Sequence, residues 1–265
     1  MRHIPIELIF TLSVLIIVCS IEVGFRVGRF IHRHSKNEKE APVSAISGTT
    51  MGLLAFILAF TFAIVTERFD SRKELVRDEA NVLRTIFLRS EFLSPNDHAE
   101  AVSLLKRYVE LRVLAVQSRT IEEIGSAITE SEQIQTALWS KAVANARRDM
   151  NSDVGALYIE ALNEMMSLHA LRVTVGLHLG VPTVIWCILL SLVALGMFGI
   201  GYQTAIAGSR RTLATFLLAV SFSLVIAMIA ELDRPDARYL VVPQQPLIHL
   251  KQWMISWPPS SPSLG

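Results

Sequence analysis

The sequence predicts an all-α membrane protein with four transmembrane helices in two hairpins and an all-helical extramembrane domain between spans two and three. Hydrophobic residues make up 51% of the 265 residues and charged residues only 18%, whereas a soluble domain carries roughly a quarter. Four apolar runs reach about 20 residues, the length that crosses a hydrocarbon core of roughly 30 Å. Between the second and third runs the sequence becomes charged, with helical periodicity and no strand alternation.

The first hairpin is expected over residues 1–66. Its first span runs from Ile6 to about Phe25, and its second is uncharged from Ala41 to Thr66. The first run has no small-residue cleavage pattern, so we expect it to be retained as a helix and not removed as a signal peptide. A short basic loop joins the two spans and contains Arg26, Arg29, Arg33, Lys36 and Lys39.

Residues 67–172 are expected to form a helical bundle in water, because mixed charge accompanies the helical periodicity and no run is long enough to span a bilayer. The pair Ser94–Pro95 is typical of a helix start, with serine as the N-cap and proline in the first turn. One helix should therefore end near Glu91 and the next should begin at Pro95.

Two charges in this domain fall where apolar residues are expected. At about 100° per residue, Glu79 lies within the apolar sector of its helix and Arg112 lies in the middle of the next apolar face. Because an unpartnered buried charge costs several kcal/mol, we predict that Glu79 pairs with Arg112, with Arg72 as the competing partner. The pair either fixes only the register of the helices or couples the bundle to the spans.

The second hairpin is expected over residues 173–231, with spans from Val173 to Ser209 and from Thr212 to Ala230. The third run is longer than one span requires, so its first two turns are assigned to the helix that enters the membrane, with a kink at Pro182. Residues 232–265 are rich in proline and are expected to lie along the surface.

Composition and motifs argue against several classes of function. The formal net charge of +1 gives no basic footprint for a nucleic acid. The sequence contains no glycine-rich phosphate loop, no G-x-S-x-G elbow and no H-E-x-x-H helix, so neither an enzyme nor a bound cofactor is expected. Scattered histidines, and cysteines at Cys19 and Cys187 within apolar runs, predict no metal site.

Several motifs resemble the bestrophin-like domain family of bacterial membrane proteins of unknown function. They follow one another along nearly the whole chain and are Arg68-Phe69-Asp70-Ser71-Arg72, Asp78-Glu79-Ala80-Asn81, Leu88-Arg89, Tyr108 with Arg112, Asn163-Glu164-Met165, Leu232-Asp233-Arg234-Pro235 and Pro246-Leu247. The most specific of them is Glu79-Ala80-Asn81. The resemblance implies two hairpins around a helical cytosolic domain, as in bestrophins, which are pentameric ion channels.

The second span carries Phe56 and Phe60 one helical turn apart. Aromatic residues at that spacing usually pack against neighbours, but around the axis of an oligomer they would form a hydrophobic constriction. The resemblance implies that this span lines a pore, with Arg68 and Arg72 at its mouth. We therefore expect a homo-oligomer, a pentamer by the resemblance, that passes inorganic ions across the inner membrane. The alternative is a non-conducting membrane-anchored scaffold or sensor.

Two indicators of sidedness disagree. Counting lysine and arginine in short loops places Arg26–Lys39 inside and leaves the helical domain outside. The resemblance implies the reverse, and Arg68 and Arg72 just after the second span agree with it. We adopt the second orientation, with the domain and both termini in the cytoplasm, as the expectation.

Overall fold

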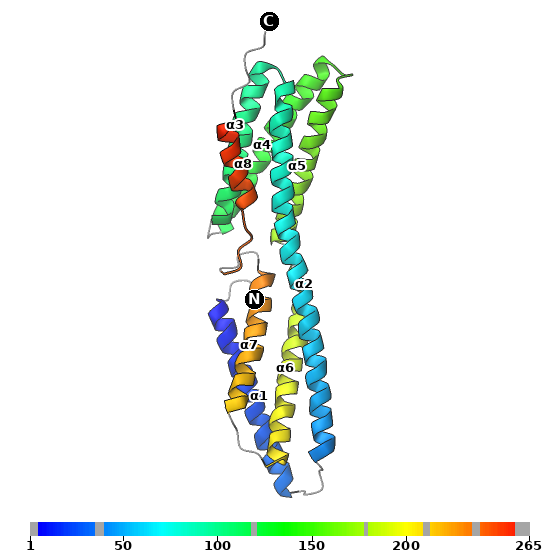
Figure 1. Ribbon diagram of the computed structural model, residues 1–265, viewed down its shortest axis with the longest axis vertical. Helices are drawn as coiled ribbons and strands as arrows, with labels where there is room; N and C mark the ends of the chain where they lie inside the picture. Colours follow the sequence, from blue (N-terminus) through cyan, green and yellow to red (C-terminus); the bar gives the residue numbers. More distant parts are fainter. Residues whose placement is uncertain are drawn as a thin grey trace. The chain divides into compact units, whose positions relative to one another are not determined.

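The computed structural model describes residues 5–34, 40–117, 121–177, 180–208, 213–234 and 239–257, and every regular element in these ranges is helical. The elements are α1 (Ile6–His34), α2 (Glu40–Arg89), the 3₁₀ turn η1 (Ser90–Phe92), α3 (Pro95–Gln117), α4 (Ile121–Arg148), α5 (Asp153–Leu177), α6 (Thr183–Ile206), α7 (Leu213–Asp233) and α8 (Gln245–Ser256) (Figure 1). The predicted all-α fold class is confirmed. The chain divides into two compact units, each made of two stretches of sequence.

Unit 1 consists of Met1–Phe69 and Gly180–Val241. It holds α1, the first part of α2, α6 and α7. In the described ranges, four helices are long and apolar enough to cross a membrane, and these are Ile6–His34, Glu40–Phe92, Thr183–Ile206 and Leu213–Asp233. The four predicted spans therefore correspond to α1, α2, α6 and α7.

The helices α1 and α6 pack backbone against backbone. A Cβ atom on Gly24 of α1 would lie 2.1 Å from the carbonyl oxygen of Phe198, and a Cβ atom on Gly201 of α6 would lie 2.1 Å from that of Ile21. No side chain fits at either point. Small residues allow this close approach where lipid supplies no hydrophobic drive for helix association.

The third apolar run differs from the prediction of one kinked helix. Helix α5 ends at Leu177 and α6 begins at Thr183, so the helix is interrupted before the span. Pro182 is the N-cap of α6, with φ −54° and ψ 139°. Proline offers no N–H and pushes the preceding residue towards extended backbone, which ends one helix and permits the next to begin.

Unit 2 consists of Asp70–Leu179 and Val242–Gly265. It holds the second part of α2 together with η1, α3, α4, α5 and α8. The predicted boundary is confirmed, because α2 ends at Arg89, η1 follows and α3 begins at Pro95. Ser94 caps α3 by accepting a hydrogen bond from the backbone N–H of Asp97 at 3.4 Å.

The expectation of a surface tail is wrong for α8. Leu247, Leu250 and Met254 are buried in the core of unit 2, at spacings of three and four residues that make one apolar face. Helix α8 packs against α3. Its proline, Pro246, stands in the first turn, where the missing N–H has no intrahelical partner to lose.

Candidate functional site

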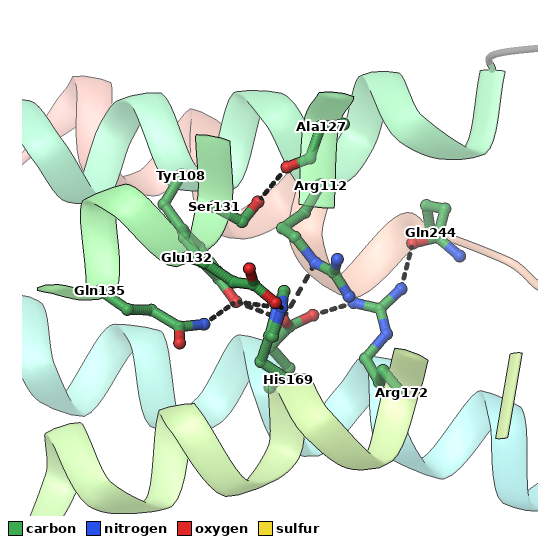
Figure 2. Close-up of polar contacts among 10 residues, drawn as sticks. Tyr108, Arg112, Ala127, Ser131, Glu132, Gln135, His169, Arg172 and Gln244 are labelled. Atoms are coloured by element: carbon green, nitrogen blue, oxygen red, sulfur yellow. Dashed lines mark hydrogen bonds and ion pairs between the residues drawn. The ribbon is translucent and has the colours of Figure 1, made fainter. Parts of the chain in front are cut away.

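A polar cluster lies inside the helical bundle of unit 2, and Glu79 of α2 is at its centre. The Glu79 side chain has 0% exposure, and its Oε1 atom lies 3.1 Å from Nε of Arg112 on α3. Its Oε2 atom accepts a hydrogen bond from Arg172 on α5. One carboxylate therefore faces two guanidinium groups from two other helices. Figure 2 shows both arginines converging, with Gln244 beyond Arg172.

Tyr108 links this carboxylate to a second group of polar side chains. Its hydroxyl donates to Glu79 Oε1 at 3.0 Å, lies 3.2 Å from Nδ1 of His169, and accepts from Nε2 of Gln135 at 3.4 Å. The hydroxyl donates its one proton to the charged carboxylate of Glu79, so His169 must donate from Nδ1 to the tyrosine oxygen. With the proton on Nδ1, the Nε2 atom of His169 is unprotonated and carries a lone pair.

The Nε2 atom of His169 is buried, has no hydrogen-bond partner among the described residues, and lies 3.9 Å from Oε1 of Glu132 on α4. Burial, followed by the positive charge of Arg112, lowers the pKa of His169 to about 4. The imidazole is therefore neutral at pH 7, as the lone pair on Nε2 requires.

The arginines stay charged despite their burial. Burial lowers the pKa of Arg172 to about 10 and also lowers the pKa of Arg112. Burial raises the pKa of Tyr108, so its hydroxyl keeps its proton. With His169 neutral and Glu79 ionised between two arginines, these five groups carry one excess positive charge at pH 7.

The cluster extends to the segment before α8. Arg172 also donates to Oε1 of Gln244 at 3.4 Å, so residues on α2, α3, α5 and the approach to α8 share one network. It contains no activated nucleophile, and the described residues hold no group of three or more metal-ligating side chains. The arrangement can hold charged side chains in fixed positions.

The helical periodicity of α2 and α3 identified Glu79, Arg112 and Tyr108, but Arg172 and His169 were missed. Both lie on the buried face of α5: His169 stands four residues after Met165, which is fully buried, and Arg172 stands three residues after His169. Spacings of three and four residues separate Leu162, Met165, His169 and Arg172, and this helical periodicity places all four on one face. Arg172 stands directly before the third apolar run, where the sequence alone indicates the approach to a span and not the interior of the bundle.

Two further residues from the sequence prediction lie elsewhere on α2. Arg72 is half-buried, and Asn81 is exposed. The backbone carbonyl of Asn81 accepts a hydrogen bond from the hydroxyl of Thr85 at 3.0 Å. Nothing in the described contacts assigns a role to the Asn81 side chain.

The two aromatic residues of the second span form a pair on the surface of unit 1. Phe56 is 65% exposed and Phe60 is 59% exposed. Their ring centroids are 6.5 Å apart, and the ring planes differ by 14°. The pair is therefore stacked and available to contact lipid or another chain.

The motif at the end of α7 joins two membrane helices within unit 1. Asp233 Oδ1 accepts a hydrogen bond from the backbone N–H of Val181 at 2.8 Å, just before α6. The same oxygen lies 3.7 Å from Nη1 of Arg68 on α2. Arg234 is half-buried after the last residue of α7, and Pro235 lies outside the described residues.

Comparisons with known proteins agree with this architecture. The family description "Bestrophin-like domain" matches residues 14–247. A crystal structure of a mutant bacterial bestrophin homologue from Klebsiella pneumoniae is 17% identical, with a TM-score of 0.66 over 94% of this chain and 97% of that chain. Another structure of a bestrophin homologue from the same organism, also 17% identical, gives 0.65 over 95% and 97%. A mutant membrane protein gives 0.65 at 15% identity over 94% and 97%. A comparison with curated proteins finds no match.

Proposed function

The chain belongs to the bestrophin-like domain family, and on that premise we propose that it assembles into an oligomeric ion channel in which α2 lines the pore. Phe56 and Phe60 form the hydrophobic constriction. Two exposed, stacked aromatic rings on one face of a membrane helix carry this proposal. Rings from several copies around one axis would gate the passage of ions by excluding water.

The same helix has a face suited to packing against a neighbouring copy. A row of small residues runs along the exposed side of α2 beside the phenylalanines, and it consists of Ala45, Gly48, Gly52, Ala55, Ala59 and Ala63. A Cβ atom on Gly48 or Gly52 would meet nothing within 4 Å. Membrane helices associate closely along such rows, which supports an assembly with α2 helices side by side.

We place Arg68 and Arg72 at the mouth of the pore. They lie one turn apart after the apolar part of α2. The side chain of Arg68 is 33% exposed, and its ion pair with Asp233 is long, at 3.7 Å. A guanidinium group at the pore entrance would attract anions, an interaction that salt in solution would weaken.

For the buried cluster we propose a positioning role. One carboxylate that must meet two guanidinium groups permits one register of α2, α3 and α5. The open alternative is that the cluster couples the bundle to the spans. Alanine at Glu79 or Arg112 with assembly and stability unchanged would contradict both roles.

Two measurements on the purified full-length chain test the channel. Its mass in detergent should correspond to a symmetric oligomer, for which we propose a pentamer. In liposomes the protein should carry ionic current, and the double variant Phe56→Ala/Phe60→Ala should carry more because the constriction is wider. Phe216→Ala is the matched control, since Phe216 is also an exposed aromatic residue (56%), on α7. The current of that variant should equal that of the wild type.

Absence of current at every voltage and salt concentration would remove the channel proposal. The remaining candidate would be a membrane-anchored scaffold or sensor, which the separate core of unit 2 favours, because a bundle with its own core can bind a partner. A monomer or dimer in detergent would favour this function.

We further propose that the protein lies in the inner membrane with the helical domain and both termini in the cytoplasm. A reporter fused after Gly265 that is active only in the cytoplasm tests this orientation. Activity of a periplasmic reporter at the same position would reverse it.

A further inference from the structure

The last two turns of α1 extend past the apolar part of the helix. The run from Ile6 to Phe25 contains 20 residues, which at about 1.5 Å per residue span the hydrocarbon core of roughly 30 Å. The helix nevertheless continues to His34. Residues from Arg26 onward therefore lie at the depth of the lipid headgroups.

This end of α1 has an inner and an outer face. Gly24 and Gly28 are buried against α6, where a Cβ atom on either would come within 3 Å of a backbone atom. Arg26, Arg29 and Arg33 are exposed, and at about 100° per residue they lie on the side of the helix opposite these glycines. The arginines consequently point away from the protein.

Apolar residues alternate with the arginines on the outer face. Phe30 is 64% exposed and lies four residues after Arg26 and three residues before Arg33, so it is their neighbour on the helix surface. Val27 is 36% exposed and lies three residues before Phe30. A surface that offers guanidinium groups and apolar side chains side by side suits the boundary between headgroups and acyl chains. It fits a ligand that carries both an anionic group and a hydrocarbon chain.

The charges on this face are unequally compensated. Arg26 Nε is held by Glu22 Oε1 at 2.6 Å. Arg29 and Arg33 have no carboxylate within ion-pair distance in the part of the chain that the structure describes. They stand four residues apart, with Cβ atoms about 5–6 Å from each other, so both guanidinium groups can reach one phosphate. Arginine binds phosphate oxygens with paired, charge-assisted hydrogen bonds.

We propose that Arg29 and Arg33 form a binding site for the phosphate of an anionic phospholipid, with Phe30 and Val27 against its acyl chains. The apolar residues and the position at headgroup depth favour a lipid over free phosphate. The site lies on a single helix of unit 1 and requires neither ion conduction nor a particular orientation in the membrane.

Native mass spectrometry of the full-length chain in detergent, titrated with phosphatidylglycerol or phosphatidylcholine, tests the site. The wild type should bind phosphatidylglycerol more tightly. Arg29→Gln/Arg33→Gln should weaken phosphatidylglycerol binding about thirtyfold, since each basic residue contributes about fivefold near anionic lipid. The control Arg77→Gln/Lys106→Gln removes the same charge from exposed positions of unit 2 and should leave binding unchanged.

Equal binding of the two lipids by the wild type would overturn the proposal. So would equal phosphatidylglycerol affinity in the wild type and the glutamine variant, or an equal loss in the control. Displacement of the lipid by inorganic phosphate at matching concentration would identify a free-phosphate site instead. If the glutamine variant does not fold, Arg29→Lys/Arg33→Lys should keep the preference for phosphatidylglycerol and lose it as salt increases, and a salt-independent preference would contradict the proposal.

Discussion

Replacing Glu79 with alanine should destabilise the helical bundle more than replacing either of its arginine partners. The Glu79 carboxylate contacts Arg112 at 3.1 Å and also binds Arg172, and all three side chains are at most 11% exposed. Glu79→Ala therefore leaves two buried guanidinium groups without a counter-charge. Arg112→Ala leaves the carboxylate still bound to Arg172, so its cost should be smaller.

The magnitude follows from the burial of these groups. Removing one partner of a buried ion pair costs about 3–5 kcal/mol, because the remaining charge cannot be solvated. Loss of the shared acid should therefore cost at least this much. For a chain of this size, each kcal/mol lowers the unfolding midpoint by about 2–4 °C, so Glu79→Ala should lower it by about 6–20 °C.

Thermal unfolding in detergent, followed by tryptophan fluorescence, measures this loss, and Trp139, Trp253 and Trp257 report from unit 2. Glu74→Ala on the same helix is the matched control. Its side chain is 65% exposed and its pair with Arg77 is 3.5 Å long, so its removal should cost at most about 1 kcal/mol. Equal midpoints for the Glu79 and Glu74 variants, or a larger loss for Arg112→Ala than for Glu79→Ala, would refute the shared-acid reasoning.

Three further measurements test other parts of the fold. Gly201→Ala should lower the unfolding midpoint of the membrane unit, because its methyl group would lie 2.1 Å from a backbone oxygen. Gly125→Ala on α4 enters open space and should change the midpoint little; equal effects would disprove the close packing. Folding lowers the pKa of His169 from 6.5 to about 4, so the folded state favours the neutral imidazole. This contribution of about 3 kcal/mol to stability should be complete above pH 6.5 and lost as the pH falls towards 4. His169→Gln should flatten this pH dependence of the midpoint, and an unchanged slope would contradict the assignment. Leu247→Ala should cost about 2–5 kcal/mol, since Leu247 is fully buried; Ile255→Ala, at a position 68% exposed on the same helix, should cost little, and similar losses would show that α8 is not part of the core.

Much of the membrane architecture could be predicted from the sequence, because the length of an apolar run is fixed by the thickness of the bilayer. The central ion pair of the buried cluster could also be predicted from the sequence. A charge inside an otherwise apolar helical face requires a partner, and this reasoning selected Glu79 and Arg112, which lie 3.1 Å apart. The second partner, Arg172, required knowledge of which helix lies across from α2.

The remaining features depend on packing that periodicity does not encode. Helix α8 has only 12 residues, among prolines, so its three buried residues did not stand out from a surface tail. The break before α6 depends on whether Pro182 bends a helix or ends one, and both outcomes satisfy the local chemistry of proline. The contact between Gly24 and Phe198 involves residues far apart in sequence, and composition alone gives no sign that they meet.

The chain order of unit 2 has a consequence for its biosynthesis. Its two stretches are separated by Gly180–Val241, so the ribosome must complete α6 and α7 before Leu247 and Met254 emerge. Until then the nascent bundle exposes the apolar surface that α8 later covers, and Arg172 lacks its contact with Gln244. Closure of this unit must therefore wait until translation has passed the last membrane helix, and a chain truncated before Gln245 should be a substrate for cellular proteases.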